Sequence, residues 1–414
     1  MAGGAVRDLL MNIKPSDIDL ATDATPAQMK DMFERNGVRM FNKNGEGHGT
    51  VSCRIDDKEN FEITTLRVDV VCDGRRARVE FTTDWQKDAN RRDLTVNSLF
   101  LDFDGTVIDY FGGINDWGFP GDFQSKIALE EDYLRILRYF RFFGRIANPG
   151  APHEKECIEA IVANRAGLSE ISGERIWMEL KKLCVGRLAG EVMTVMLKEC
   201  ALGPYLGIPS SISLEDFKKI FNYNCSRGLL PITLLSSLFK DLKDLERFHK
   251  RCKLSKVEYG LGEFIISFRE TVPQGTCLFS YLRNLLISLE RAPDRGIWAH
   301  NLRFLIDLFP DSRKLDNRML VTETAKYFLA PSDVVESLSS LIIPDFPVCG
   351  SDLLRAGITE GPFMRVVLKH LFEIWKSTGY TATKSELLCR ANEVNPDSSD
   401  GQPRIVRKRK RLNT

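Results

Sequence analysis

The sequence lacks the patterns that mark several protein classes. No apolar run reaches the roughly 18 residues that a membrane-spanning helix needs, and the first residues do not have the pattern of a signal peptide. None of the ten cysteines forms a C-x-x-C pair, which argues against a zinc ribbon or a redox dithiol. The five histidines show no ligand pair at helical spacing, which argues against a histidine-based metal site or catalytic triad. We therefore expect a soluble intracellular protein with reduced thiols.

An excess of one charge sign is also missing. The 58 basic and 57 acidic residues leave a formal net charge of +1, so any contact with nucleic acid must come from local patches. Apolar residues make up 43% of the chain and charged residues 28%, which excludes global disorder and allows a packed core throughout. The length of 414 residues predicts roughly two to four domains.

Residues 1–112 have the pattern of strands with helices packed on them. Short β-branched runs predict strands at 49–55, 61–68 and 94–101. Between the first glycine-rich motif and these runs lies a helical stretch at 25–33. There Thr25 is a natural N-cap and Pro26 occupies the first helical position.

From about residue 130 onward, apolar residues recur at three- and four-residue steps, which predicts helices. The expected helices lie around 131–145, 174–184, 214–222, 232–250, 278–292, 296–309 and 363–377. About two thirds of the chain is therefore predicted to be all-helical. Residues 395–414 have the composition of a disordered tail and contain the basic run 407–411.

The first candidate site combines two glycines with a pair of aspartates. Gly3 and Gly4 precede a helical segment, where the backbone can approach a phosphate closely, and Arg7 is suited to bind triphosphate oxygens. Asp17 and Asp19 lie two residues apart, so both carboxylates share one face of an extended strand. Carboxylate pairs hold Mg²⁺ together with substrate phosphates. Each half alone is equally typical of a plain turn, and it is their joint occurrence that predicts a site.

The second candidate site opens a strand-like run with Arg91 and Arg92 and includes Asn97. On its own, this pattern is typical of a charged turn before a buried strand. Beside a triphosphate site, Arg92 becomes a candidate phosphate or ribose contact. Asn97 becomes a candidate ribose or backbone anchor.

The third candidate site is a predicted helix with one acidic and four basic residues on the face opposite its core. At about 100° per residue, the apolar side chains share one arc and the charged ones form a stripe. Asp accepts from an amine and Arg donates to ring acceptors, so such a pair is suited to read a base edge. A salt-bridged bundle helix is the alternative. The stripe consists of Asp132, Arg135, Arg138, Arg141 and Arg145.

A fourth motif, at 172–180, is interpreted as structural. Ser172 is a suitable N-cap for a helix that packs on the arginine helix. Glu174 or Glu179 is then expected to orient the arginines.

In this order and spacing, the four motifs resemble those of class II CCA-adding tRNA nucleotidyltransferases, in their eukaryotic form. The resemblance is dense over 1–185 and returns at 346–353. It implies an α/β nucleotidyltransferase head of the DNA polymerase β superfamily, followed by an all-helical neck, body and tail. The implied domains are a head at 1–112, a nucleotide-recognition neck at 113–190, a helical body at 191–310, a tRNA-binding tail at 311–394 and a disordered basic end at 395–414.

The resemblance also implies roles for individual residues. Asp17 and Asp19 match the metal-binding pair, and Glu62 occupies a strand that supplies a third carboxylate in the superfamily. Asp132 and Arg135 match the protein template that selects CTP and then ATP. The segment 69–78 lies where the family has a flexible loop. The other residues that match nucleotide contacts are Gly4, Arg7, Arg92, Asp93, Arg138 and Arg141.

The implied activity is addition of the 3′-terminal CCA sequence to tRNA, with CTP and ATP as substrates, Mg²⁺ as cofactor and pyrophosphate as product. The acceptor end of tRNA is the implied partner, bound by basic residues at 181–182, at 247–256 and at the terminal run. That run fits a nuclear address or a solvated tail equally well. The implied locations are the mitochondrion and the cytoplasm, with the nucleus as a further option. The oligomeric state stays open.

Two rival functions remain open at this point. One is a poly(A) polymerase-like RNA nucleotidyltransferase, which shares the head and the metal pair. The other is a catalytically silent RNA-binding protein, because only Met1 and Ala2 precede the first motif where the family has a further strand. We expect that strand to be missing through truncation or in an isoform. The junction at 116–121 is also shorter than in the family and lacks its basic residues, and Met364 and Arg365 replace a common glycine.

Overall fold

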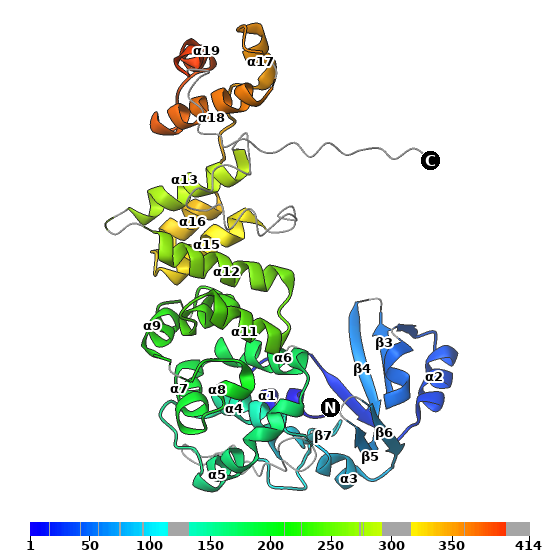
Figure 1. The fold of residues 1–414 in the computed structure, drawn as a ribbon. Helices are drawn as coiled ribbons and strands as arrows, with labels where there is room; N and C mark the ends of the chain where they lie inside the picture. Colours follow the sequence, from blue (N-terminus) through cyan, green and yellow to red (C-terminus); the bar gives the residue numbers. More distant parts are fainter. Residues whose placement is uncertain are drawn as a thin grey trace, which may run out of the picture. The chain divides into compact units, whose positions relative to one another are not determined.

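The computed structural model describes residues 1–15, 17–41, 43–56, 58–73, 76–92, 95–114, 132–210, 212–224, 226–272, 275, 277–291, 316–359 and 361–394. The chain splits into two compact units, Met1–Gly262 and Glu263–Thr414, and the boundary falls within helix α12 (Lys256–Thr271) (Figure 1). Four regions with sequence predictions lie outside the described residues: Asp93, the junction at 116–121, the helix at 296–309 and the tail at 395–414.

The head contains a four-stranded mixed sheet with the strand order β1-β4-β3-β2. The strands are β1 (Asp19–Thr22), β2 (Arg39–Phe41), β3 (Thr50–Ile55) and β4 (Glu59–Thr65). Strand β1 pairs with β4 in parallel, and the other two pairs are antiparallel. Met29 and Phe33 of helix α2 (Pro26–Arg35) pack against Val51 and Cys53 of β3, so the helix covers one face of the sheet (Figure 1).

The start of α2 confirms the prediction made from Thr25 and Pro26. The Thr25 hydroxyl accepts a hydrogen bond from the Gln28 backbone N–H, and the Gln28 side chain accepts one from the Thr25 backbone N–H. Pro26 stands in the first turn, where its missing N–H costs no helical hydrogen bond. The strand predictions at 49–55 and 61–68 correspond to β3, most of β4 and the start of a further strand.

The segment at 69–78, expected to be a flexible loop, has the backbone of a hairpin in its described part. Strand β5 (Arg67–Asp73) pairs with β6 (Arg76–Phe81) in an antiparallel sheet with one irregularity in register. Helix α3 (Trp85–Asn90) follows, and β7 (Phe100–Leu101) pairs with β8 (Val107–Ile108) in a third small sheet.

The strand predicted at 94–101 is wrong for most of its length. Thr95–Asn97 form the 3₁₀ helix η2, and only Phe100–Leu101 are extended in a ladder. Polar side chains explain the difference, because the Ser98 hydroxyl donates to the Ala89 carbonyl and the Asn97 amide oxygen accepts from Arg7. These side-chain hydrogen bonds offer the backbone an alternative to a ladder.

In the described residues from 132 onward, every regular element is helical. Those of the first unit are α4 (Arg135–Ile146), α5 (Lys155–Asn164), η3 (Arg165–Glu170), α6 (Gly173–Cys184), α7 (Ala189–Thr194), η4 (Val195–Glu199), α8 (Gly203–Leu206), α9 (Glu215–Asn224), α10 (Pro231–Leu235), η5 (Ser236–Leu238) and α11 (Leu242–Cys252). The helices predicted at 174–184 and 214–222 are confirmed as α6 and α9. The single helix predicted at 232–250 is wrong, because Asp241 caps a new helix by accepting from the backbone N–H groups of Lys243 and Asp244.

The described part of the second unit is a set of helices. These are α13 (Leu278–Arg291), α15 (Asn317–Tyr327), α16 (Ser332–Ser339), α17 (Gly350–Arg355), α18 (Pro362–Ser377), α19 (Lys384–Cys389) and η7 (Ala391–Glu393). The helices predicted at 278–292 and 363–377 are confirmed as α13 and α18. None of the described helices is long and apolar enough to cross a membrane.

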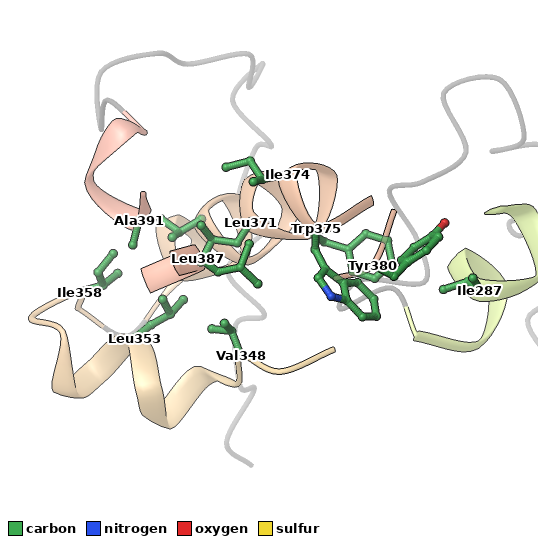
Figure 2. Packing of buried hydrophobic residues seen from close by; sticks show 12 residues of the cluster. Ile287, Val348, Leu353, Ile358, Leu371, Ile374, Trp375, Tyr380, Leu387 and Ala391 are labelled. Atoms are coloured by element: carbon green, nitrogen blue, oxygen red, sulfur yellow. The ribbon is translucent and has the colours of Figure 1, made fainter. Parts of the chain in front are cut away.

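The C-terminal helices share a hydrophobic core of their own. Trp375 of α18 packs against Phe372 and Tyr380. Leu353 of α17 and Leu387 of α19 belong to the same core beside α18 (Figure 2). Ile287 belongs to the same cluster, and the Tyr380 hydroxyl donates to the Asn284 side-chain oxygen at 2.8 Å. These contacts connect α13 with the helices at the end of the described chain.

Candidate active site

The first motif lies against both β1 and the second motif. The Ala2 N–H donates to the Asp19 carbonyl, and the Gly3 N–H donates to the Leu99 carbonyl, each at 2.9 Å. Gly3 has a φ of +70°, and a Cβ there would lie 2.9 Å from Nη1 of Arg92. Only glycine combines this conformation with such a close approach. Helix α1 (Gly4–Leu10) begins directly after this turn, as the two glycines predict.

Asp19 lies beside this turn, and two further carboxylates, Asp17 and Glu62, affect its charge. Asp19 and Glu62 are register partners in the parallel pair of β1 and β4, so their side chains lie on the same face. Partial desolvation, followed by the charges of Asp17 and Glu62, raises the pKa of Asp19, while Arg92 lowers it. The same-face argument for Asp17 is corrected, because β1 begins at Asp19 and Asp17 lies in the bend before it. Asp17 is nevertheless close enough to Asp19 for its charge to raise the pKa of Asp19.

The chemistry of this donor set fits a hard divalent cation. Carboxylate oxygens are the ligands that Mg²⁺ prefers, and repulsion among close carboxylates is relieved when a cation binds. In the part of the chain that the structure describes, no group of three or more His, Cys, Asp or Glu side chains is arranged to hold a metal by itself. Mg²⁺ commonly binds one or two carboxylates together with a triphosphate.

Arg92 stands close to these carboxylates. It is held by Asp88, which accepts from Nη2 at 2.9 Å, and its guanidinium lies 5.0 Å from the centre of the Phe100 ring. Asp88 also accepts from Arg91 and from the Arg67 backbone N–H. Burial opposes ionisation of Asp88, but the arginines and these hydrogen bonds lower its pKa below the usual value. The sequence reasoning missed Asp88, since an acidic residue in the first turn of a short helix carries no distinctive pattern.

Arg7 is buried, with only 3% of its surface exposed. Its Nε and Nη2 donate to Oδ1 of Asp8 at 3.0 and 2.7 Å, and its Nη1 donates to the Asn97 side-chain oxygen. The structure thus brings the predicted residues Arg7 and Asn97 together, in contact with each other. Gly4 borders the same group, because a Cβ on Gly4 would lie 3.4 Å from Nη2 of Arg7.

The arginine helix begins later than predicted. Helix α4 starts at Arg135, and Asp132 precedes it, where its Oδ1 accepts from the Leu134 backbone N–H at 3.0 Å. Aspartate favours such positions because its side chain satisfies free N–H groups at a helix start. Oδ2 of Asp132 accepts from Arg175 of α6. Arg135 is largely buried.

The middle of α4 is joined to α6 through Glu179. Arg141 Nη1 lies 2.7 Å and Arg138 Nε 3.7 Å from the Glu179 carboxylate, and Glu179 is only 6% exposed. This confirms that Glu179, one of the two acids expected, contacts the arginines. Ser172 stands at the N-cap position of α6 but makes no side-chain capping hydrogen bond. Arg175 was interpreted only as part of a structural motif, and its contact with Asp132 was missed.

Comparison with known proteins decides the family. The family model of the Poly A polymerase head domain matches residues 1–118. The Homo sapiens protein named CCA tRNA nucleotidyltransferase 1, mitochondrial, is 45% identical to this chain over 393 residues, which are 94% of this chain and 85% of the human protein.

The chain belongs to the CCA tRNA nucleotidyltransferase family.

Solved structures of CCA-adding enzymes have the same fold. The Bacillus stearothermophilus enzyme in complex with CTP matches with a TM-score of 0.67 at 24% identity, over 95% of this chain and 92% of that one. The Thermotoga maritima enzyme complexed with tRNA matches with a TM-score of 0.57 at 20% identity, over 95% and 90%. This confirms the predicted fold of a nucleotidyltransferase head followed by helical regions. Membership in the nucleotidyltransferases also implies dependence on a divalent metal ion.

Proposed function

We propose that this chain completes the 3′ end of tRNA by adding C, C and A from CTP and ATP, with release of pyrophosphate. The observation that carries the proposal is Asp19, which pairs in register with Glu62, interacts with the charge of Asp17 and lies near Arg92 and the Gly3 turn. It lies in a chain that is 45% identical to a protein named for this activity. The family membership favours an enzyme over the catalytically silent alternative.

Asp17 and Asp19 are the proposed ligands of Mg²⁺, with Glu62 as a third carboxylate. Bound there, the ion would lower the pKa of the terminal 3′-hydroxyl of tRNA and neutralise the charge of the triphosphate. The raised pKa of Asp19 supports this assignment, since a cation relieves the repulsion from Asp17 and Glu62 that contributes to it.

The phosphate end of the nucleotide is assigned to the glycine turn and Arg92. A turn without Cβ atoms lets phosphate oxygens approach backbone N–H groups, and Arg92 supplies a positive charge near Asp19. Arg7 and Asn97 belong to the proposed nucleotide contacts as well. Arg7 is buried beside the turn and bonded to both Asp8 and Asn97. Asp93 belongs to the same proposed set, although it lies outside the described residues.

The base end is assigned to the start of α4. Cytosine and adenine both present an exocyclic amine next to a ring acceptor, so one Asp–Arg pair serves both bases. Asp132 and Arg135 are the proposed pair, with Arg138 and Arg141 behind them on the same helix. Uracil and guanine present the reverse order of donor and acceptor, which leaves the carboxylate facing an acceptor.

The domain boundaries at 112, 190, 310 and 394 stay proposals, as does tRNA binding by basic residues of the helical regions. Within the stretch at 247–256, Arg251 is used internally, because it donates to the carbonyls of Tyr205, Leu168 and Ile171. Lys181 is paired with Glu258 at 2.5 Å. A mitochondrial location is supported by the name of the human relative, and cytoplasmic or nuclear locations rest on the family resemblance alone.

The test is an incubation of purified protein with Mg²⁺, tRNA that lacks its 3′ end and each labelled nucleotide, with products resolved at single-nucleotide length. We expect ordered addition of C, C and A followed by a stop. A long ladder from ATP alone would identify a poly(A) polymerase instead. Absence of any incorporation would favour the silent RNA-binding protein.

A further inference from the structure

Helix α4 is held at its two ends by different elements. Before its first turn, Asp132 accepts a hydrogen bond from Arg175 of α6. In its last turn, Nη2 of Arg145 lies 2.6 Å from Oδ2 of Asp8 in α1, the helix that follows the glycine turn. The base-reading helix is thus tied directly to the element that forms the proposed phosphate site.

Asp8, which accepts from Arg145, is held in place by other residues of the head. Asp8 is buried, with 4% of its surface exposed, and its other oxygen receives both Nε and Nη2 of Arg7. Arg7 is in turn bonded to Asn97 of η2. Because Arg7 holds the other oxygen of the Asp8 carboxylate, Arg145 is linked through Asp8 and Arg7 to the glycine turn and to the second motif. Arg145 itself has a half-exposed side chain and reaches Asp8 from α4.

A second contact, made by Phe142, also joins α4 to α1. The Phe142 ring on α4 lies 5.2 Å from the guanidinium carbon of Arg7 and 4.2 Å from that of Arg141. Arg141 pairs with Glu179 of α6 at 2.7 Å. The ring therefore packs against an arginine of the head and an arginine of α4, which adds van der Waals and cation–π contact to the ion pair of Arg145 and Asp8.

The ion pair of Arg145 with Asp8, at the end of α4, affects the position of the base-reading residues at the start of the helix. Residues 135 and 145 are separated by roughly 15 Å along an α-helix. Without Arg145, the ion pairs of α4 that remain bind it to α6 through Asp132 and Arg141. A small rotation of α4 relative to α1 would then shift the base-reading residues relative to the phosphate site. One nucleotide must reach both places at once, so the separation of the two places affects whether its base can bond to Asp132 and Arg135 while its triphosphate is bound.

We propose that Arg145 is a positioning residue for nucleotide selection. By pairing with Asp8 it holds α4 at a fixed place relative to the glycine turn, so that only a base matched to Asp132 and Arg135 is bound while its triphosphate is in line. This inference rests on the proposed function. It differs from a merely stabilising role, which would lower the amount of folded enzyme without changing the ratio between nucleotides.

The experiment compares Arg145→Met and Arg145→Lys with the wild type and with Arg35→Met. Arg35 is the matched control, because its substitution also removes one charge and one ion pair, with Asp31 at 2.5 Å, on the exposed face of helix α2. For each protein, kcat/KM is measured for CTP and UTP on tRNA that lacks its 3′ end. Thermal unfolding is recorded under the same conditions.

We expect Arg145→Met to lower the ratio of kcat/KM for CTP over UTP by roughly 10- to 100-fold, because displacements of about 1 Å have effects of that size. Arg145→Lys keeps the charge and should retain more of the ratio, and Arg35→Met should match the wild type. A Met variant that loses activity equally with both nucleotides overturns the proposal, as does a Lys variant no better than Met. If the Met variant unfolds at the assay temperature, Arg145→Lys and Arg145→Gln decide, and equal selectivity in these two overturns the proposal.

Failure of the proposed function is seen separately, in the wild type. A wild-type protein that makes a long A ladder overturns CCA addition, and the ratio of ATP over GTP then replaces the CTP over UTP ratio as the readout for Arg145. A wild-type protein without any incorporation overturns both.

Discussion

The carboxylate of Asp132 accepts a hydrogen bond from Arg175 of α6. Its second oxygen accepts from the Leu134 backbone N–H, so both oxygens of the proposed base-reading acid have partners. A base that uses Asp132 must therefore share or replace the contact with Arg175. This makes Arg175 either a support that orients Asp132 or a competitor for it.

We expect Arg175 to act as a support. Arg175→Ala should lower kcat/KM for both CTP and ATP by roughly 10- to 100-fold, because a hydrogen bond to a charged group contributes about 1.5–3 kcal/mol. Arg175→Lys should retain part of the activity. Steady-state kinetics with tRNA that lacks its 3′ end measures this, and a rise in kcat/KM for the Ala variant would identify a competitor instead.

Loss of the charge on Asp19 should abolish nucleotide incorporation without weakening the binding of tRNA. Asp19→Asn keeps the shape of the side chain but removes a proposed metal ligand, and kcat should fall roughly 10³-fold because metal stabilisation of the transition state is worth several kcal/mol. The dissociation constant for tRNA should stay within about 2-fold, since the protein is expected to recognise tRNA by its shape and its phosphates. Asp23→Asn, on an exposed residue just after β1, is the control. Near-normal incorporation of labelled CMP by Asp19→Asn would refute the assignment.

Chelation tests the metal dependence directly. Excess EDTA should abolish incorporation of CMP, and added Mg²⁺ should restore it, because the carboxylates need a cation to bind the triphosphate. Incorporation that survives chelation would contradict the metal site. A titration with Mg²⁺ on Asp23→Asn should reproduce the wild-type curve.

Stability should fall in weak acid because of His153. This ring stacks on Phe143 with centroids 3.8 Å apart, and burial lowers its pKa to about 4, with Glu191 opposing the shift. The unfolded chain has a histidine pKa near 6.5, so between pH 6.5 and 4 the unfolded state binds more protons and is favoured as the pH falls. The contribution of neutral His153 is complete above pH 6.5 and decreases toward pH 4, by roughly 1–3 kcal/mol. Unfolding curves of wild type and His153→Gln across this range give the unfolding free energy at each pH. Equal slopes of this free energy against pH in the two proteins would contradict the prediction.

Gly173→Ala should destabilise the first unit. A Cβ at Gly173 would lie 2.0 Å from the Arg251 carbonyl oxygen, so α6 or α11 must shift. We expect a loss of roughly 1–3 kcal/mol of unfolding free energy, since overpacking costs that much and exceeds the gain in helix propensity. Gly47→Ala has open space around it and serves as the control. Equal denaturation midpoints for the two variants would contradict this.

The sequence predicts best what depends on neighbouring residues. The cap at Thr25 and the amphipathic helices α6 and α18 depend on residues a few positions apart, and the structure confirms them. The segment at 94–101 fails because its β-branched residues favour a strand locally, while Asn97 is bound by Arg7 from 90 positions earlier. Tertiary contacts of this kind override local preference.

The polar network of the site could not be predicted for the same reason. Asp8 and Arg145 are 137 positions apart, and Asp132 and Arg175 are 43 apart, so no spacing indicates the pairing. The residues were visible in motifs, but their partners depend on how α1, α4 and α6 pack. The predicted nucleotide contacts of Arg7, Arg138 and Arg141 stay predictions, since the structure shows their protein partners alone.

The register of the head sheet has a consequence for mutations far from any charged group. A shift of β4 by one residue would place Phe61 or Ile63 opposite Asp19 in place of Glu62. What prevents the shift is the apolar face where Val51 and Cys53 of the neighbouring β3 lie under α2. The pairing of Asp19 with Glu62 therefore depends on apolar side chains on the α2 face of the sheet. A large-to-small substitution at Val51 would therefore act on the acidic groups through the packing of the sheet, while every polar atom of the site is still in the chain.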